Sequence, residues 1–453
     1  MTEYPAYFKI MLVIAIALCG LFFSDRHFSK RAKAPLDAAP EWLTELCLFL
    51  FSFLLFYLLN NKEFVYYNNY SYLADALLNG RLYVDGMPEY LESVRFAGHT
   101  YMHFAPGPAL LCLPFVALFG VNGFNIAYLS LFLGAGNSVL FYRVFRQLGI
   151  GRDRRERLWC TGLAVFGTVH CFLAAVGHSW FLGHVSSWFF LLLSMYFLTR
   201  REAGRNVDLF LSGLFFGLAV TCRMACLPGA VFFAGYILLK RRKNGLIKAA
   251  LCFAAGAAVF GGLYMLYDYV RYGTIMDRGY NLTHLKDKYR SLYDAMQELE
   301  TPQAQTAFLK EAEAQYGGPL SLSNVRYNLY SIFLMMPKYT QQAPYIVPTL
   351  NGVSLTALSP ALYFACAAPL RKQPLWRYTL SAMVFCAIPF LLNYGNGAAQ
   401  FGMRYAMDFL PYTLLLAGAG LTRTPVKGWK KALILFCVFV NLWGPVYWRF
   451  FYL

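Results

Sequence analysis

Long apolar runs, each close to the roughly 20 residues that a helix needs to cross a membrane, follow one another along most of this sequence. Hydrophobic residues make up 58% of the 453 residues and charged residues 14%, which is too apolar a balance for a soluble globular protein. Because a bilayer offers no water to the backbone, a segment that spans it must form its hydrogen bonds internally, as a helix does. The sequence therefore predicts an all-α, polytopic membrane protein.

Short basic clusters separate the apolar runs and predict the orientation of the helices. Lys and Arg collect in the cytoplasmic loops of membrane proteins, so topology explains the formal net charge of +17 and no nucleic-acid partner is expected. The basic loops expected on the cytoplasmic face are 26–33, 143–157, 200–205, 240–243, 371–377 and 423–431. The twelve crossings that agree with this placement are 6–24, 41–60, 124–145, 158–178, 182–198, 207–222, 226–240, 246–266, 355–371, 375–393, 405–421 and 431–449.

Two stretches are too long and too polar to be turns, and we expect them outside the membrane. The first external loop, 61–123, contains the apolar segment Pro108–Phe119, which is short and broken by proline and so should lie along the outer surface. The second, 267–356, begins with a soluble, helical stretch and ends in apolar sequence interrupted by prolines. The remaining predicted parts are an extra N-terminal helix with a basic loop (1–40), a core that includes the first loop (41–266) and C-terminal helices (357–453).

The first external loop carries the densest group of carboxylates, histidines and tyrosines. Leucines at helical spacing predict a surface helix around Asp75, whose carboxylate, flanked by alanines near the membrane, suits a general base. A solvated charge on a surface helix is the alternative for Asp75, and more so for Asp85, Glu89 and Glu92. The further candidates for the substrate cavity from this loop are Tyr70, Asp85 and His103.

Histidines and an arginine at the outer ends of apolar runs form a second group of candidates. His103 precedes a Pro-Gly-Pro turn and either binds sugar or shuttles protons, or packs as a hydrogen-bonded neighbour of the turn. His184 follows Trp180 and either lines a substrate cavity or anchors the chain at the interface. Arg223 ends an apolar run, where a lone charge is costly unless an anion pairs with it. That anion is either a carboxylate of this chain or a phosphate, and the phosphate is favoured.

The stretch QFGMRYAMDFLP, residues 400–411, opens an apolar run from the external side. Arg404 and Asp408 stand four apart, so they either pair along one helix face or hold a ligand together. In the second case, Arg404 binds a lipid phosphate through its planar, permanently charged guanidinium and Asp408 orients it. Gln400 is a further candidate for the cavity.

Five strings, in this order, resemble bacterial members of the GT-C glycosyltransferase superfamily: YLADALLNGRLYVD, YMHFAPGPALLCLPFVALFG, FYRVFRQLG, YVRYGTIMDRGYN and QFGMRYAMDFLP. The order of spans and of the two large loops is similar as well. The resemblance implies a multi-pass enzyme of the cytoplasmic (inner) membrane that takes a sugar from a polyprenyl-phosphate carrier, with its active site facing the periplasm or exterior. It also implies membrane lipids and a lipid or glycan acceptor as partners.

The sequence departs from this resemblance at one position. Similar members often carry an acidic pair just before the tyrosine cluster, where this chain has Asn68 and Asn69. The base would then be Asp75, or Glu63 near the end of the preceding span. The resemblance implies a single displacement in which Asp75 takes the acceptor proton while arginines neutralise the leaving phosphate. The candidates for binding that phosphate are Arg404, Arg223 and Arg278.

No cofactor is expected from the sequence. The eleven cysteines lie in or beside apolar runs and predict neither disulfides nor a zinc site. The first loop has no carboxylate cluster suited to a hard divalent cation, so no metal is expected, although the superfamily varies in metal dependence and a divalent metal stays open. Two other functions also stay open: a transporter or flippase of a lipid-linked saccharide, which needs no base, and a non-catalytic partner in envelope-polymer assembly.

Overall fold

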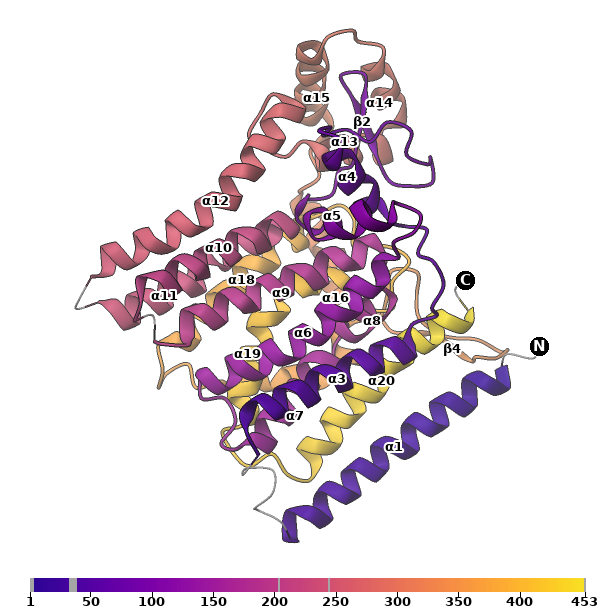
Figure 1. Cartoon of the computed structure of the whole chain (residues 1–453). Helices are drawn as coiled ribbons and strands as arrows, with labels where there is room; N and C mark the ends of the chain where they lie inside the picture. The colour runs from indigo at the N-terminus through magenta and orange to yellow at the C-terminus, as the bar shows by residue number, and fades with distance from the viewer. Residues whose placement is uncertain (1–3, 32–38, 203, 243–244, 452–453) are drawn as a thin grey trace.

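The computed structural model describes residues 4–31, 39–202, 204–242 and 245–451, most of which are helical. A slanted bundle of long helices carries a smaller external cap at one end (Figure 1). The bundle contains α1 (Tyr4–Arg31), α3 (Glu41–Leu59), α6 (Ile126–Gln147), α7 (Arg154–Phe166), α8 (His170–Val176), α9 (Ser179–Thr199), α10 (Asn206–Cys222), α11 (Ala230–Arg241), α12 (Leu246–Tyr272), α18 (Leu375–Leu392), α19 (Leu410–Leu421) and α20 (Trp429–Phe451).

The external loops and the breaks between spans hold the shorter elements. The first loop contains α4 (Asn69–Leu78), β1 (Val94–Phe96), β2 (His99–Tyr101) and α5 (Gly107–Phe119). The second contains α13 (Gly279–Lys288), α14 (Arg290–Gln297), α15 (Pro302–Tyr316), η2 (Leu322–Asn324), α16 (Val325–Phe333), β3 (Lys338–Tyr339), β4 (Ile346–Val347) and the start of α17 (Leu355–Leu358). Three further 3₁₀ helices are η1 (Met224–Gly229), η3 (Pro360–Ala367) and η4 (Arg404–Asp408).

The predicted all-α, multi-pass architecture is confirmed, but the count of twelve crossings is not. Within the described residues, seven helices are long and apolar enough to cross a membrane, or eight if α7 and α8, which are bent by 60°, form one span. Four other predicted spans do not qualify. The span 124–145 is the 22-residue α6, which is long enough but not apolar enough. The remaining three are short or interrupted: 207–222 is the 17-residue α10, 355–371 contains α17 and η3, and 405–421 contains η4 and the 12-residue α19. The predicted basic loop at 26–33 lies partly outside the described residues.

Glycines let α10 and α12 approach each other closely. A Cβ on Gly213 would lie 1.9 Å from the carbonyl oxygen of Phe253, and one on Gly256 would lie 2.0 Å from that of Phe210. Small residues serve this purpose in membranes because apolar surface alone gives a helix no preference for another helix over lipid. The close pair fixes the outer end of α10, and with it Arg223, relative to α12.

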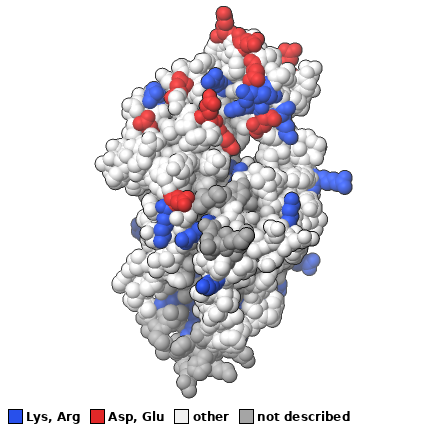
Figure 2. Space-filling model, turned by 90° about the vertical axis from the view of Figure 1, so that its right-hand side faces the viewer, with Lys and Arg blue, Asp and Glu red and all other residues white. Residues whose placement is uncertain are grey.

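The two external loops form one cap with a hydrophobic core of its own. The antiparallel β1–β2 hairpin packs on α13, α14 and α15, and it donates from the Arg95 amide to the Tyr293 hydroxyl at 2.6 Å. Arg271, at the end of α12, donates to the carbonyl oxygen of Met102 at 3.0 Å. Figure 2 shows acidic side chains gathered at the upper end of the molecule, over this cap, with basic ones among them. The core consists of Val94, Phe96, Tyr101, Tyr272, Leu282, Leu285, Tyr293, Met296, Leu309 and Ala312.

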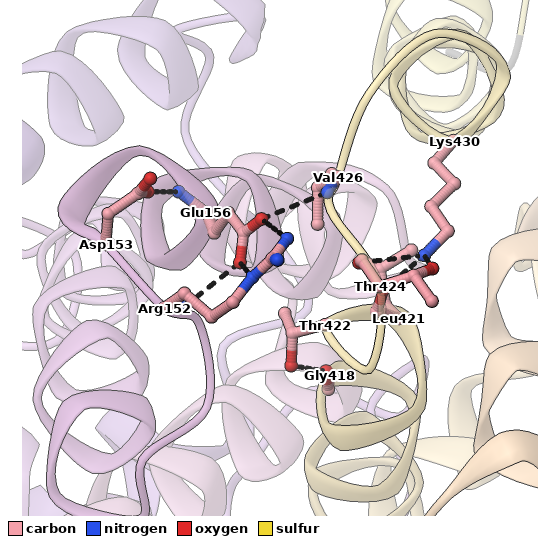
Figure 3. Close-up of polar contacts among 9 residues, drawn as sticks. All are labelled: Arg152, Asp153, Glu156, Gly418, Leu421, Thr422, Thr424, Val426 and Lys430. Atoms are coloured by element: carbon pink, nitrogen blue, oxygen red, sulfur yellow. Dashed lines mark hydrogen bonds and ion pairs between the residues drawn. The ribbon is translucent and has the colours of Figure 1, made fainter. Parts of the chain in front are cut away.

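The helix ends that carry the predicted basic loops lie away from the cap (Figure 1). Glu156, in the first turn of α7, accepts hydrogen bonds from the Arg152 guanidinium at 2.5 Å and from the Val426 amide at 3.0 Å (Figure 3). Lys240 and Glu202 pair at 2.9 Å across two other loops. Carboxylates therefore tie these basic connections to one another.

A buried lysine closes the gap between α19 and α20. The Lys430 ammonium donates to the carbonyl oxygens of Leu421 at 2.5 Å and Thr424 at 3.1 Å, and to the Thr424 hydroxyl at 2.9 Å (Figure 3). The last carbonyls of a helix have no partner within that helix, and a cation beside them also interacts favourably with the helix dipole. Lys430 therefore caps α19 from the start of α20.

Replacing Lys430 with Met keeps a long side chain but removes these three hydrogen bonds. Because hydrogen bonds to charged groups contribute about 1.5–3 kcal/mol, we expect the free energy of unfolding to fall by about 2 kcal/mol. A lower apparent Tm of the detergent-solubilised protein would report this loss. Lys427→Met, at an exposed position in the same connection, is the matched control and should leave Tm nearly unchanged. Equal Tm values for Lys430→Met and the wild type would contradict the capping role.

Candidate functional site

A polar cavity of about 390 Å³ lies between the outer end of the bundle and the external cap. This volume is within the range of small-molecule sites. The lining comes from α4, α9, the end of α10, α13, η4, the segments 92–93 and 103–105, and the connection 393–398. The predicted site residues that the fold brings to this cavity are Tyr70, His103, His184, Arg223 and Arg404.

Arg223 and Asp408 form a bidentate ion pair at the bundle side of the cavity. Nε of Arg223 lies 3.1 Å from Oδ1 of Asp408, and Nη2 lies 2.7 Å from Oδ2. The sequence favoured a phosphate as the partner of Arg223, and the structure supplies a carboxylate instead. The Trp188 indole donates to the carbonyl oxygen of Met407 at 2.6 Å and fastens this segment to α9. His184 lies beside the pair, 3.6 Å from Asp408, which is too far for a hydrogen bond.

Arg404 does not pair with Asp408, although the two stand four apart. Residues 404–408 form the 3₁₀ helix η4, in which positions four apart are turned by about a third of a turn instead of aligned, and Asp408 faces Arg223. Nη1 of Arg404 donates to the carbonyl oxygen of Ala398 at 2.8 Å, and the guanidinium lies 5.9 Å from the Trp180 ring centre. Among the described residues, no carboxylate lies within ion-pair distance of Arg404. This leaves a largely buried cation at the cavity wall without a counter-charge.

Gln400 supports Arg404 from behind and is not part of the cavity lining. Its amide nitrogen donates to the carbonyl oxygens of Asn351 at 2.8 Å and Asn396 at 2.9 Å, and its amide oxygen accepts from the Arg404 amide at 3.3 Å. The Asn396 amide in turn donates to the Ser331 hydroxyl at 2.9 Å. Neutral groups of three chain segments therefore hold Arg404 in place without cancelling its charge.

The cap side of the cavity carries two carboxylates, Glu92 and Asp287, together with Lys286. The Tyr394 hydroxyl donates to Oδ2 of Asp287 at 2.9 Å. The Glu92 side chain is 51% exposed, and its Oε2 lies 3.6 Å from Nε2 of His103, beyond hydrogen-bond distance. Burial lowers the pKa of His103 to about 4, so its ring is neutral at neutral pH. The cavity is thus cationic on the bundle side and mixed, with carboxylates, on the cap side.

Asp75 lies outside the cavity, contrary to the expectation that its helix turns it inward. The helix α4 buries the face that carries Tyr70 and Leu73, and at about 100° per residue Asp75 falls on the opposite face. Its side chain is 45% exposed, and Oδ2 lies 3.7 Å from Nη2 of Arg81. Glu63 is exposed and is also absent from the cavity lining.

Asp85 and Arg278 belong to the cap and not to the cavity. Asp85 accepts a hydrogen bond from His99 at 2.9 Å, and although burial alone would raise its pKa, the bonds from His99 and Thr100 outweigh that effect and lower it. Nη1 of Arg278 lies 3.4 Å from Oε2 of Glu313. Both residues therefore have partners on the cap and no contact with the cavity.

Sequence reasoning missed the cavity residues of the second loop and set Glu92 aside as solvated. Lys286, Asp287 and Tyr394 reach the cavity because α13 folds back over the β1–β2 hairpin and meets the connection after α18, which no local pattern records. The one available signal was the polar stretch NYGNGA, residues 393–398, which interrupts two apolar runs. A polar break at the outer end of a span often lines a cavity.

No metal centre is present among the ranges that the structure describes, where no three His, Cys, Asp or Glu side chains come close enough to hold an ion. The independence from metal that the sequence led us to expect stays a prediction. The eleven cysteines are free thiols in the structure.

Comparison with known proteins finds a family model that matches part of the sequence and solved structures that are similar to this one. Residues 103–287 match the family model for glycosyltransferase family 87. The crystal structure of ArnT from Cupriavidus metallidurans, bound to undecaprenyl phosphate, superposes with a TM-score of 0.50 at 12% identity and covers 87% of this chain and 62% of ArnT. The archaeal oligosaccharyltransferase AglB from Archaeoglobus fulgidus, in complex with an inhibitory peptide and a dolichol-phosphate, gives a TM-score of 0.48 at 15% identity and covers 90% of this chain and 55% of AglB. No curated protein matches the sequence.

The match to ArnT confirms the predicted fold, and the family model links residues 103–287 to a glycosyltransferase family. The chain has the fold of ArnT while spanning 62% of that protein's length. The matched segment begins at His103 and ends at Asp287, both of which line the cavity. It also contains His184, Arg223 and Lys286, so much of the cavity wall lies within the part of the chain that matches the glycosyltransferase family.

The Arg223–Asp408 pair can be tested by removing its charges singly and together. Asp408→Asn leaves the guanidinium without its counter-charge, so we expect the free energy of unfolding to fall by about 2–4 kcal/mol, less than for a fully dry pair because the cavity admits water. Arg223→Met/Asp408→Leu removes both charges and should recover part of that loss. Thermal unfolding in detergent measures both effects. The matching single variants are Arg223→Met and Asp408→Leu. A double variant that loses the sum of their two losses would contradict the pairing.

Proposed function

We propose that this chain is a membrane glycosyltransferase that moves a sugar from a polyprenyl-phosphate carrier to an acceptor hydroxyl. The observation that carries the proposal is Arg404, a guanidinium at the wall of a polar cavity for which the described residues supply no carboxylate. Phosphate suits such a group because guanidinium and phosphate form parallel, charge-assisted hydrogen bonds. The glycosyltransferase family match and the undecaprenyl phosphate bound to ArnT support the same donor class.

The proposed location is the cytoplasmic membrane, with the cavity facing the outside. The predicted basic loops lie at the end of the bundle away from the cap, and lysine and arginine retain such loops on the cytoplasmic side. A carrier whose tail lies in the outer leaflet would then present its phosphate and sugar to the cavity beneath the cap.

The reaction is a single displacement at the anomeric carbon of the donor sugar. The acceptor oxygen forms a bond to this carbon while the bond from the carbon to the phosphate oxygen breaks, and the polyprenyl phosphate leaves with the electron pair. Arg404 stabilises the negative charge that develops on the phosphate. A carboxylate on the opposite side of the cavity accepts the proton of the attacking hydroxyl.

Glu92 fits the role of this base better than the other carboxylates. One oxygen of Asp287 already accepts a hydrogen bond from the Tyr394 hydroxyl, and Asp75 faces away from the cavity. Glu92 lines the cavity, and the neutral His103 ring beside it is too far away for a hydrogen bond. Among the described residues nothing donates a hydrogen bond to its carboxylate oxygens, which can therefore accept a proton from a substrate.

Substitution of Arg404 tests the donor site. Loss of one preorganised group that stabilises developing charge typically costs about 10²–10³ in rate, so we expect that loss in kcat/KM for Arg404→Met and a smaller one for Arg404→Lys. The readout is release of polyprenyl phosphate from a panel of polyprenyl-phosphate hexoses by the purified enzyme. Arg290→Met, an exposed position on the cap, is the matched control. Full activity of Arg404→Met would show that Arg404 does not stabilise the donor phosphate.

Substitution of Glu92 tests the base. Glu92→Gln keeps the shape of the side chain but cannot take the acceptor proton, so we expect kcat to fall about 10²–10⁴-fold while the KM for the donor changes little. Glu89→Gln, three residues away and exposed, is the matched control. If Asp75→Asn abolished turnover and Glu92→Gln did not, the role would return to Asp75.

The same assays separate this function from two others. A transporter or flippase would move the lipid-linked sugar across proteoliposomes without forming a glycosidic bond, and Glu92→Gln would leave that movement intact. An assembly partner would release no polyprenyl phosphate from any donor. Glycosidic bond formation that depends on Glu92 and Arg404 favours the transferase over both.

A further inference from the structure

An aromatic surface adjoins the cavity on the side of Glu92. The Tyr67 ring lies 4.7 Å from the Trp180 ring, at an interplanar angle of 36°, and 6.2 Å from the Tyr90 ring, which meets it edge-on at 87°. Trp180 also lines the cavity. These three residues, Tyr67, Tyr90 and Trp180, are called the aromatic ledge below.

Two rings of the ledge are exposed while Trp180 is partly buried, and the position of all three is fixed. Tyr90 is 56% exposed and Tyr67 is 38% exposed. The Ser179 amide, next to Trp180 at the start of α9, donates to the carbonyl oxygen of Tyr67 at 3.0 Å. The His178 ring packs 5.5 Å from Tyr67 and 6.1 Å from Trp180. The first loop and the start of α9 thus hold the rings together on the outside of the molecule.

The polar groups of the ledge distinguish it from a purely apolar patch. The indole nitrogen of Trp180 is buried, so the polar groups that the ledge presents to a ligand are the hydroxyls of Tyr67 and Tyr90. Both tyrosines carry a hydroxyl, and Tyr90 precedes Glu92 by only two residues. Tyrosine and tryptophan offer a large, rigid contact face together with a hydrogen-bonding group at a small cost in conformational entropy. A sugar ring presents the matching surface, with C–H groups on one face and hydroxyls around its edge.

We propose that the ledge is a subsite for the acceptor and that the acceptor is a saccharide of at least two units. The inference rests on the proposed function, because a general base at Glu92 requires the attacking hydroxyl to lie beside Glu92, at the rim of the cavity. The rest of the acceptor must then continue outward from the rim, past Tyr90 and onto Tyr67 and Trp180. The terminal sugar occupies the cavity and the next sugar stacks on the ledge.

The test compares acceptors of increasing length. Octyl glycosides of glucose and mannose with one, two or three sugar units are offered to the purified enzyme in nanodiscs, with a polyprenyl-phosphate hexose as donor. For wild type, the second unit should lower the acceptor KM about tenfold, as expected for one good aromatic contact. Tyr90→Ala and Tyr67→Ala should abolish this gain while leaving the KM for the donor unchanged. Tyr66→Ala, an exposed tyrosine of the same segment outside the ledge, should retain it.

The outcomes separate the subsite from the activity. If wild type gains nothing from the second sugar, or if Tyr66→Ala loses as much as Tyr90→Ala, the subsite is wrong while the transfer itself stands. Equal losses with one-unit and two-unit acceptors would mean that the rings anchor the protein at the membrane surface, which also overturns the subsite. If the enzyme transfers no sugar to any of these acceptors, calorimetric titration of the same glycosides measures their binding directly. Binding that depends on Tyr90 and Tyr67 without any transfer would keep the subsite and reject the proposed transferase activity.

Discussion

A guanidinium at the edge of a membrane needs an anion, and the two arginines beside the cavity meet this need differently. Arg223 receives both oxygens of Asp408, so its charge is cancelled within the protein. Arg404 is held by the carbonyl oxygen of Ala398 and by Gln400, which fix its position without supplying a negative charge. The neutralised pair anchors η4 to the end of α10, and the close packing of α10 on α12 fixes that end. Among the described residues, the bundle therefore presents Arg404 to the cavity without a counter-charge.

The cap and the bundle are stabilised by different interactions. Helices in lipid gain little free energy from burying apolar surface against one another, so their packing depends on small residues such as Gly213 and Gly256. The cap lies outside the apolar spans, so a hydrophobic core stabilises it. That core joins segments nearly 200 residues apart, such as Arg95 and Tyr293. Because Arg271 of α12 binds the carbonyl oxygen of Met102, the cap is fixed to the bundle at the residue before His103. The cavity is the space left where two differently stabilised bodies meet.

The parts of this architecture that follow from local pattern could be read from the sequence, and those that depend on distant pairing could not. Apolar runs and basic loops predicted the multi-pass bundle, and the short proline-broken segment Pro108–Phe119 predicted α5 as a helix separate from the long spans. Arg404 and His103 were identified because a charge or a histidine beside an apolar run is unusual. Asp75 was misplaced, because helical spacing reveals a buried face only once the packing partner is known. Asp287 was missed because its role depends on how α13 folds back over the first loop.

Asn68 and Asn69 stand where the resemblance to GT-C enzymes implies an acidic pair, and their place in the structure bears on the proposed use of Glu92. The side-chain amide of Asn69 donates to the backbone carbonyl oxygen of Glu92 at 3.1 Å, and both asparagines are buried. An ionised aspartate at 69 has no proton to donate and would place its negative charge against that carbonyl. With asparagine at this position, the start of the loop has no carboxylate there. The Asn69 amide instead fixes the backbone of Glu92, whose carboxylate lies at the rim of the cavity. A base can be relocated in this way within one fold, because the reaction requires a proton acceptor beside the attacking hydroxyl and does not require it to come from a particular turn of the chain.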